Sequence, residues 1–240
     1  MKIIGLSIQT GLFTTGFIIS DKLDIASKLT KETGTLFDGD PILIPLPPEA
    51  PQEFPRLILK NKDERYSFQA TTTRLDLFFK NEKSSTLEEK EVGSLIKKYV
   101  SDLKIVVSAV NKILQPKIIR LGFVLNLQFQ VDDAINIIKS SYIKDLKFTK
   151  DTHDLNAGFL NQDKINKINS NIWFRVNAFR LDKHPKDNKV LLVSFDINTV
   201  PEESQDLKID DIMKYVELAL KYVDDNLKVF VPQYNESIDG

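Results

Sequence analysis

The chain has 240 residues, of which 42% are hydrophobic and 28% charged, and its formal net charge is −1. This composition is typical of a globular protein with a sizeable core in one or two domains, and a charge so near zero gives no global argument for a polyelectrolyte partner. The lack of cysteine excludes disulfides, Cys-based zinc sites and thiol nucleophiles, and it fits a reducing compartment such as the cytoplasm.

The first twenty residues predict two short strands. Apolar residues dominate 2–9 and 15–19, but polar residues such as Gln9 and Thr14 interrupt any signal-peptide core, and no small-residue cleavage motif follows. No apolar run in the chain approaches the roughly 18 residues that a membrane-spanning helix needs. We therefore expect a cytoplasmic protein without a membrane segment.

Residues 21–79 predict a short helix, a connector and a hairpin. The helix covers 21–32, with an aspartate as its N-cap. Residues 41–55 contain six prolines, which fix φ and remove amide donors, so this stretch is expected to be extended connector. Two strands at 56–60 and 65–79 flank the turn-forming sequence Asn-Lys-Asp-Glu and indicate a hairpin.

A long amphipathic helix is predicted next, ending at Leu114. Thr86 and Glu89 have the spacing of a capping box at its start. Its apolar residues are spaced alternately four and three apart, and further apolar neighbours widen the stripe, as expected for a helix that packs on a sheet. The stripe consists of Val92, Ile96, Tyr99, Leu103, Val106, Val110 and Ile113.

The sequence IIRLGFVLNLQF at 118–129 alternates strictly. Every odd position is apolar, whereas the even positions include Arg120, Gly122, Asn126 and Gln128. A period of two over this length predicts a β-strand with one dry face. The other face is either solvated or a contact surface.

The following region is less regular. Asp132 or Asp133 is expected to cap a short helix that ends at Tyr142. Residues 146–170 are polar with few periodic cues, and we interpret them as strand and loop or a mobile insertion.

The C-terminal part repeats the earlier pattern. Strands at 171–181 and 189–199 form a second hairpin, a second amphipathic helix covers 206–227, and a final strand is predicted at 228–232. Hairpin, long helix and strand therefore occur twice. This order favours a single α+β domain over residues 1–240, in which two long helices pack on one face of an antiparallel sheet. Two similar halves, 1–130 and 131–240, are a structural hypothesis without residue-level identity.

Charge is distributed unevenly. Residues 54–120 hold 14 Lys and Arg against 8 Asp and Glu, a net charge of +6, whereas residues 194–240 hold 4 against 11, a net charge of −7. One interpretation is two differently charged solvated faces. Another is a homo-oligomer in which complementary faces associate. A third is a nucleic-acid-associated accessory protein that uses the basic region.

Four short segments resemble motifs of one family: Phe54-Pro55-Arg56, Arg74–Phe79, Arg120–Asn126 and Val193–Ile197. On them the chain resembles a sporadically distributed bacterial family of uncharacterised conserved hypothetical proteins. That family carries an aromatic-Pro-Arg hairpin start, strands of the forms R-[LF]-x-x-N-W and R-[IL]-G-x-R-Y-x-N, and an apolar-Asp-apolar strand before the last helix. Phe78-Phe79 replaces Asn-Trp here, and Asn126 is one residue too close to Arg120. The resemblance implies a shared fold and no particular activity.

No motif of catalytic chemistry is present. His153 and His184 are far apart in predicted loops, and the glycine patterns of dinucleotide and phosphate loops are absent. Asp38 and Asp40 could hold a cation, but the further spaced oxygens of a calcium loop are missing, so a turn is expected. We therefore expect no metal and no cofactor, and an enzyme with an unrecognised site remains an alternative.

The polar faces of the two hairpins and of strand 118–129 form the candidate binding surface. If these strands share one sheet, arginine, amide and tryptophan side chains of matching parity lie near one another. Such side chains bind extended peptides, or bases of single-stranded nucleic acid, by stacking and directional hydrogen bonds. The sequence thus favours a non-enzymatic binding or assembly module with a protein or peptide partner. The candidate residues are Arg74, Arg120, Asn126, Gln128, Trp173, Arg175 and Asn177.

Overall fold

The computed structural model describes residues 1–47, 49–143, 155–179, 190–203, 205–232 and 234. The strands in this part of the chain form one nine-stranded sheet, in which every neighbouring pair is antiparallel. The predicted α+β class with a large antiparallel sheet is confirmed. The strands are β1 (Lys2–Thr14), β2 (Ile42–Leu43), β3 (Leu57–Lys60), β4 (Tyr66–Ala70), β5 (Arg74–Leu87), β6 (Ile118–Gln130), β7 (Asn156–Ile165), β8 (Ile168–Phe179) and β9 (Val190–Thr199).

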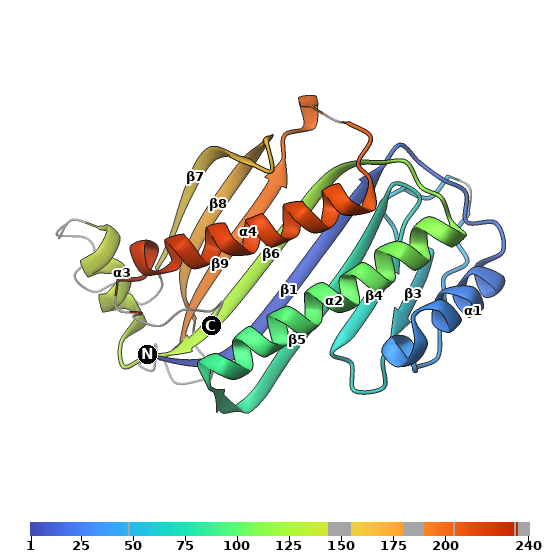
Figure 1. Ribbon diagram of the computed structural model, residues 1–240. Coiled ribbons are helices and arrows are strands. Elements are labelled where there is room, and N and C mark those ends of the chain that lie inside the picture. The colour runs from blue at the N-terminus through green and yellow to red at the C-terminus, as the bar shows by residue number, and fades with distance from the viewer. Residues whose placement is uncertain (48, 144–154, 180–189, 204, 233, 235–240) are drawn as a thin grey trace.

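The helices of the described residues are α1 (Lys22–Glu32), α2 (Glu89–Ile113), α3 (Ala134–Tyr142) and α4 (Ile209–Phe230), with short 3-10 helices η1 (Gly34–Phe37) and η3 (Pro201–Glu203). Helices α2 and α4 run next to each other over one face of the sheet, with α1 beside α2 (Figure 1). Helix α3 lies against β7 and β8 at the far end. None of the described helices is long and apolar enough to cross a membrane.

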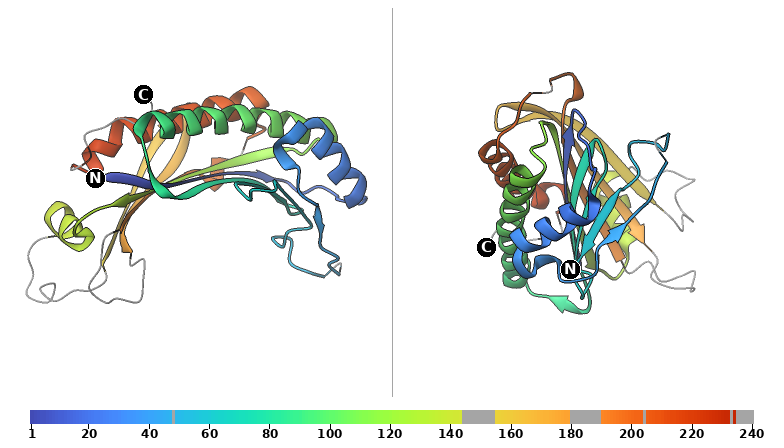
Figure 2. Two further views of the ribbon diagram at one scale, coloured as in Figure 1. Left: turned by 90° about the horizontal axis from the view of Figure 1, so that it is seen from below. Right: turned by 90° about the vertical axis from the view of Figure 1, so that its right-hand side faces the viewer.

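The sheet is arched. Its strand order is β2-β3-β4-β5-β1-β6-β9-β8-β7, so the long strands β1 and β6 form the centre. Seen edge-on, the sheet curves beneath α2 and α4, which cover its convex side, and its two ends bend away from these helices (Figure 2). We call the opposite side the concave face. Among the described elements no helix lies across the middle of this face.

The core lies between the convex side and the helices. The odd positions of β6 from Leu121 to Phe129 are all buried, as the alternation predicts. On the helix side, the stripe of α2 is buried too, apart from the half-buried Ile113. Burying one such side chain contributes about 1.5–3 kcal/mol, so this double layer supplies most of the driving force for folding.

Two buried tyrosines, Tyr99 and Tyr215, make polar contacts inside the core. The Tyr99 hydroxyl lies 2.8 Å from Thr10 Oγ1, and the Tyr215 hydroxyl lies 2.9 Å from Ser170 Oγ. Burial raises the pKa of Tyr215 to about 12, and burial also raises the pKa of Tyr142 to about 12. The neutral phenols are therefore favoured in the folded state.

The raised pKa of Tyr215 predicts that the folded protein loses stability at alkaline pH. A tyrosine in the unfolded chain ionises near pH 10. Because the folded pKa is higher, the stabilisation is complete below about pH 10 and is lost as the pH rises towards 12. Urea unfolding between about pH 9 and 11 should show this fall, and Tyr215→Phe should make it shallower. An unchanged slope in Tyr215→Phe would contradict the assignment.

The predicted strand at 228–232 is wrong. Helix α4 continues to Phe230, where it places the ring of Phe230 4.3 Å from that of Phe174, measured between centroids. Apolar packing of this last turn overrides the strand propensity of its β-branched residues. The predicted order hairpin, long helix, strand therefore occurs once in the described residues, as β4, β5, α2 and β6, because no described strand follows α4. The division into halves 1–130 and 131–240 stays a prediction.

Two element boundaries also differ from the prediction. Thr86 lies within β5 instead of capping α2. At the start of α2, the Glu88 amide donates a hydrogen bond of 3.0 Å to Glu91 Oε2. Likewise, the single strand predicted at 65–79 is two strands. The amides of Thr73 and Arg74 donate hydrogen bonds to Thr71 Oγ1. The turn formed in this way separates β4 from β5.

The N-terminal strand pair is in fact one strand. β1 runs without a break through Gln9 to Thr14, and Gly16, with φ +105°, turns the chain away from the sheet. No strand forms at 15–19. The continuity of β1 extends the polar face of the sheet by two rows, at Gly11 and Phe13.

Candidate binding surface on the concave face

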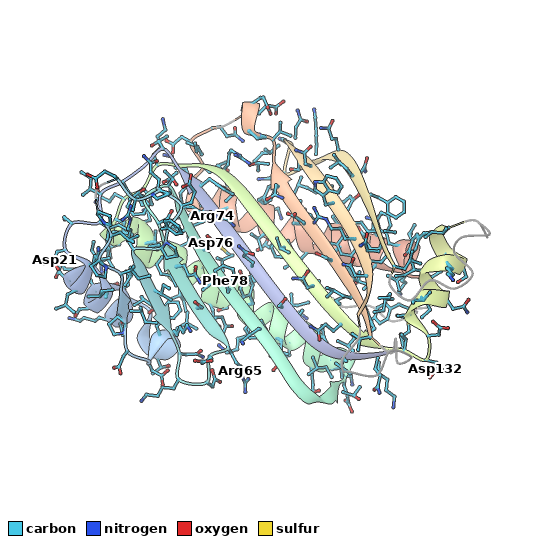
Figure 3. The ribbon with its side chains drawn as sticks, turned by 180° about the vertical axis from the view of Figure 1, so that it is seen from behind. Asp21, Arg65, Arg74, Asp76, Phe78 and Asp132 are labelled. Carbon is cyan, nitrogen blue, oxygen red and sulfur yellow. The ribbon has the colours of Figure 1, made fainter. Side chains whose placement is uncertain are left out.

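The seven residues predicted from sequence come together on the concave face. Arg74 of β5 and Arg120 of β6 are both aligned with Phe13 of β1, which lies between them. Asn126 of β6 and Arg175 of β8 are both aligned with Ser194 of β9. Gln128 of β6 and Asn177 of β8 are both aligned with Leu192 of β9. Each of the seven alternates along its strand with buried residues of the convex side. Figure 3 shows this face, with Arg74, Asp76 and Phe78 in succession along β5.

Phe13 of β1 is the centre of a stacked arrangement at one end of this face. The guanidinium carbon of Arg74 lies 4.6 Å from the centroid of the Phe13 ring, and that of Arg120 lies 4.8 Å from it. The two arginines therefore flank one aromatic ring from neighbouring strands. Cation–π contacts of this kind contribute about 0.5–1 kcal/mol each where exposed.

Arg74 is held by a buried carboxylate. Its Nη2 and Nε atoms lie 2.7 Å and 2.9 Å from Asp76 Oδ1, which also accepts a hydrogen bond of 2.9 Å from Gln9 Nε2. This pair lies across Gly11 of β1, where a Cβ atom would come within 3.0 Å of both side chains. Glycine at this position is thus what lets the ion pair cross the neighbouring strand.

Arg120 is held less completely. Its Nε atom is buried and has no hydrogen-bond partner among the described residues. Partial burial lowers the pKa of Arg120, the charge of Glu202 opposes this effect, and the charge of Arg74 adds to it. The guanidinium remains charged, because arginine does not deprotonate in proteins. Its Nε donor is therefore unused within the described part of the chain.

A second cluster surrounds the single tryptophan of the chain. The Arg175 guanidinium carbon lies 4.8 Å from the Trp173 ring centroid, and its Nη1 lies 3.2 Å from Asp196 Oδ2. Asn198 donates a hydrogen bond to the same carboxylate. Nearby, Asn126 Nδ2 donates to Ser7 Oγ at 3.0 Å. An arginine stacked on an aromatic ring thus occurs in both clusters, on Phe13 in the first and on Trp173 in the second.

A hollow of about 400 Å³ lies on the concave face over β4, β5 and β1. A larger hollow of about 660 Å³ lies at the rim near Met1 and Gln130, and none of the seven predicted residues lines it. The concave hollow is lined mainly by polar residues, and also by Ile8, Phe78 and Phe79, which suits a ligand with both hydrogen-bonding and apolar groups. Its lining includes Ser7, Gln9, Lys60, Ser67, Phe78 and Asn126.

Sequence reasoning missed several residues of this face. Phe13, Gln9 and Asp76 take part in its tightest contacts, and none was predicted. The available signal was the alternation of Ser, Gln, Gly and Phe along 7–13, which the expected break after residue 9 concealed. His153 and His184 lie outside the described residues. Within those residues, no group of three or more His, Asp or Glu side chains could hold a metal.

The basic region 54–120 does not form one patch. Lys104 and Lys112 project from α2 on the convex side, and Lys112 pairs with Glu32 at 2.6 Å. Arg74 and Arg120 are on the opposite, concave side. The excess positive charge is thus divided between two faces of the protein.

The comparisons with known proteins do not identify a family. No protein-family model matches the chain, and no curated protein matches it. Among solved structures, a crystal structure of lombricine kinase is similar over 99% of this chain and 69% of the other, with 11% sequence identity and a TM-score of 0.37. A TM-score below 0.5 supports no conclusion on fold family or activity. The chain is therefore assigned to no family, and the resemblance to a bacterial family stays a prediction.

Proposed function

We propose that the protein is a non-enzymatic, cytoplasmic binding module whose concave face holds an extended segment of a protein partner. The observation that carries this proposal is the stacking of Arg74 and Arg120 on Phe13, and of Arg175 on Trp173, on a sheet face that no described helix crosses. Aromatic rings and arginine are enriched where proteins bind proteins.

The geometry supports an extended ligand. The concave face carries side chains in rows across the strands, because aligned residues of antiparallel neighbours lie about 5 Å apart. One such row leads from Lys60 through Phe78 and Gln9 to Asp196 and Trp173. A peptide lying along this row would meet two aromatic side chains, Phe78 and Trp173, with the hydrogen-bonding groups of Gln9 and Asp196 between them.

A nucleic-acid ligand is less well supported. Asp76 and Asp196 stand on the same face as the arginines, and each is ion-paired there. Carboxylates beside the cations weaken the attraction for a chain of phosphates, which depends on accumulated positive charge. The basic region is also divided between two faces, which further weakens the attraction of either face for a chain of phosphates.

Selection of random dodecapeptides on the immobilised protein tests the proposal. We expect enriched peptides to bind the wild type, and we expect the double variant Arg120→Ala/Arg175→Ala to lose them while its melting temperature stays close to wild type, because both side chains are half-exposed. A Lys104→Ala/Lys221→Ala variant, altered only on exposed helix positions, is the matched control. A folded Arg120→Ala/Arg175→Ala variant that keeps every selected peptide would overturn the proposal. Sedimentation of the wild type shows whether a second copy occupies the face instead.

A further inference from the structure

Strand β7 ends the sheet, and its outer edge is open. It pairs with β8 on one side, and no described strand pairs with its other side (Figure 1). Eight of its ten residues are exposed, so α3, whose Tyr142 ring lies 5.6 Å from the Phe159 ring, does not cover this edge. Proteins commonly protect an edge strand by shortness, proline or a bulge. β7 has no proline and no register shift against β8, and its two charged residues, Asp163 and Lys164, both lie near one end.

The ladder between β7 and β8 decides which backbone groups of β7 face outward. The Ala178 amide donates to the Leu155 carbonyl at 2.9 Å, and hydrogen-bonded pairs alternate along an antiparallel ladder. The odd-numbered residues of β7 therefore pair with β8, whereas the amides and carbonyls of the even-numbered residues point away from the sheet. These are Asn156, Gly158, Leu160, Gln162 and Lys164. Such a row of unpaired groups is a template for another strand.

Two apolar side chains are exposed in the middle of this edge. Leu160 is 50% exposed and is aligned with Trp173 on the concave face. Phe159 is 44% exposed and is aligned with Phe174 on the convex face, with 6.2 Å between the ring centroids. A strand that pairs with this edge should therefore carry apolar side chains at its own middle, on both faces of the sheet.

We infer that this strand is β7 of a second copy, so that the protein forms a two-fold dimer with one continuous antiparallel sheet. A two-fold axis through Leu160 pairs every outward-facing residue, since Leu160 is opposite Leu160 of the second copy, Gly158 opposite Gln162, and Asn156 opposite Lys164. The two Leu160 side chains then meet on the concave face. On the convex face the two Phe159 rings lie diagonally across the axis, within reach of each other.

The charges of β7 fit this register. Lys164 is opposite Asn156 of the second copy, and Asp163 is opposite Ala157, so no like charges face each other across the axis. The strand is thus complementary to itself in hydrogen bonding, in apolar contact and in charge.

The other edge of the sheet favours a closed dimer. β2 has only two residues, and Pro41 and Pro45 close to its ends lack amide donors. The Ile44 carbonyl beside it already accepts a hydrogen bond of 2.7 Å from Lys22 Nζ. A head-to-tail contact between β7 and β2 would therefore gain few hydrogen bonds. Pairing of β7 with itself is isologous and closes at two copies.

The dimer would join two concave faces. The row of side chains in the proposed function includes Trp173, and the next residue of this row is Leu160, at the axis. The row therefore continues across the axis onto the second copy, which doubles the length of the surface. The dimer itself does not rest on the proposed function, because it forms without any other partner.

Single cysteines test the register, since the chain has no cysteine of its own. In Leu160→Cys the two Cα atoms across the axis would be about 5.5 Å apart, a distance that a disulfide spans. We expect oxidation with diamide to convert this variant to a covalent dimer. Lys164→Cys is the matched control on the same strand and face, because its two thiols would be roughly 26 Å apart. A mixture of Asn156→Cys and Lys164→Cys should cross-link, whereas neither should alone.

Sedimentation equilibrium measures the assembly. The chain has a mass of 27.4 kDa, and we expect the wild type at about 50 μM to sediment at twice this mass. Leu160→Lys should sediment as a monomer, because it opposes two like charges at the axis. Gln162→Lys adds the same charge opposite Gly158 and should remain a dimer. Both residues are exposed, so the circular dichroism spectrum of either variant should match that of the wild type.

Four results would overturn the inference. A monomeric wild type is the first, and a dimer that persists in Leu160→Lys is the second. Cross-linking of Lys164→Cys alone as fast as Leu160→Cys is the third, because it would exclude an axis through Leu160. The fourth is a dimer that dissociates in Arg120→Ala/Arg175→Ala, which would place the second copy on the concave face and count against the proposed function too. Selected dodecapeptides that bind a monomeric wild type would leave the proposed function standing without the dimer.

Discussion

Replacing Phe174 by alanine is expected to lower the free energy of unfolding by about 3–5 kcal/mol. Phe174 is 1% exposed, and its ring lies 4.3 Å from that of Phe230 and 5.2 Å from that of Phe195, measured between centroids. Truncation would remove a large buried surface, leave a cavity and break both aromatic pairs. Chemical unfolding in urea, monitored by circular dichroism, measures the effect.

The matched control is Val229→Ala. Val229 precedes Phe230 in the last turn of α4, but 69% of it is exposed, so its truncation is expected to change stability by no more than about 0.5 kcal/mol. If Phe174→Ala cost as little as the control, the last turn of α4 would not pack on the sheet. Residues 228–230 would then have to be placed differently.

Leu103→Ala is expected to cost about 2–5 kcal/mol. Leu103 lies in the middle of the α2 stripe and is 1% exposed, so its loss opens a cavity between the helix and the convex side of the sheet. The same urea titration measures it.

Lys104→Ala is the control on the next residue of the same helix. Lys104 is exposed, and alanine is the better helix former, so its replacement should change stability by less than about 0.5 kcal/mol. Similar small effects of both substitutions would mean that the stripe of α2 does not face the sheet.

Much of the candidate surface follows from local sequence. The alternation at 118–129 placed Arg120, Asn126 and Gln128 on one face of a strand, and the parity of the second hairpin placed Trp173 and Arg175 on one face of another. A period of two needs no tertiary information, because it follows from the geometry of an extended backbone. These residues do share the concave face, although their role in binding stays a proposal.

The contacts that give this face its chemistry depend on pairing between strands distant in the chain. Phe13 reaches Arg120 only because β1 pairs with β6, and reaches Arg74 only because β1 also pairs with β5. A shift of one residue in either register would turn these side chains to opposite faces. Nothing in the local pattern of either strand specifies its partner, so the Arg–Phe–Arg arrangement could not be predicted.

The sequence by itself determined the α+β class, the dry face of β6 and the apolar stripe of α2, because each is a periodicity of neighbouring residues. Only the tertiary structure decided that α4 continues to Phe230, since the aromatic contact with Phe174 outweighs local strand propensity. It also decided that β7 ends the sheet with Leu160 at its open edge, because the order of the strands in the sheet is set by non-local packing and hydrogen bonding.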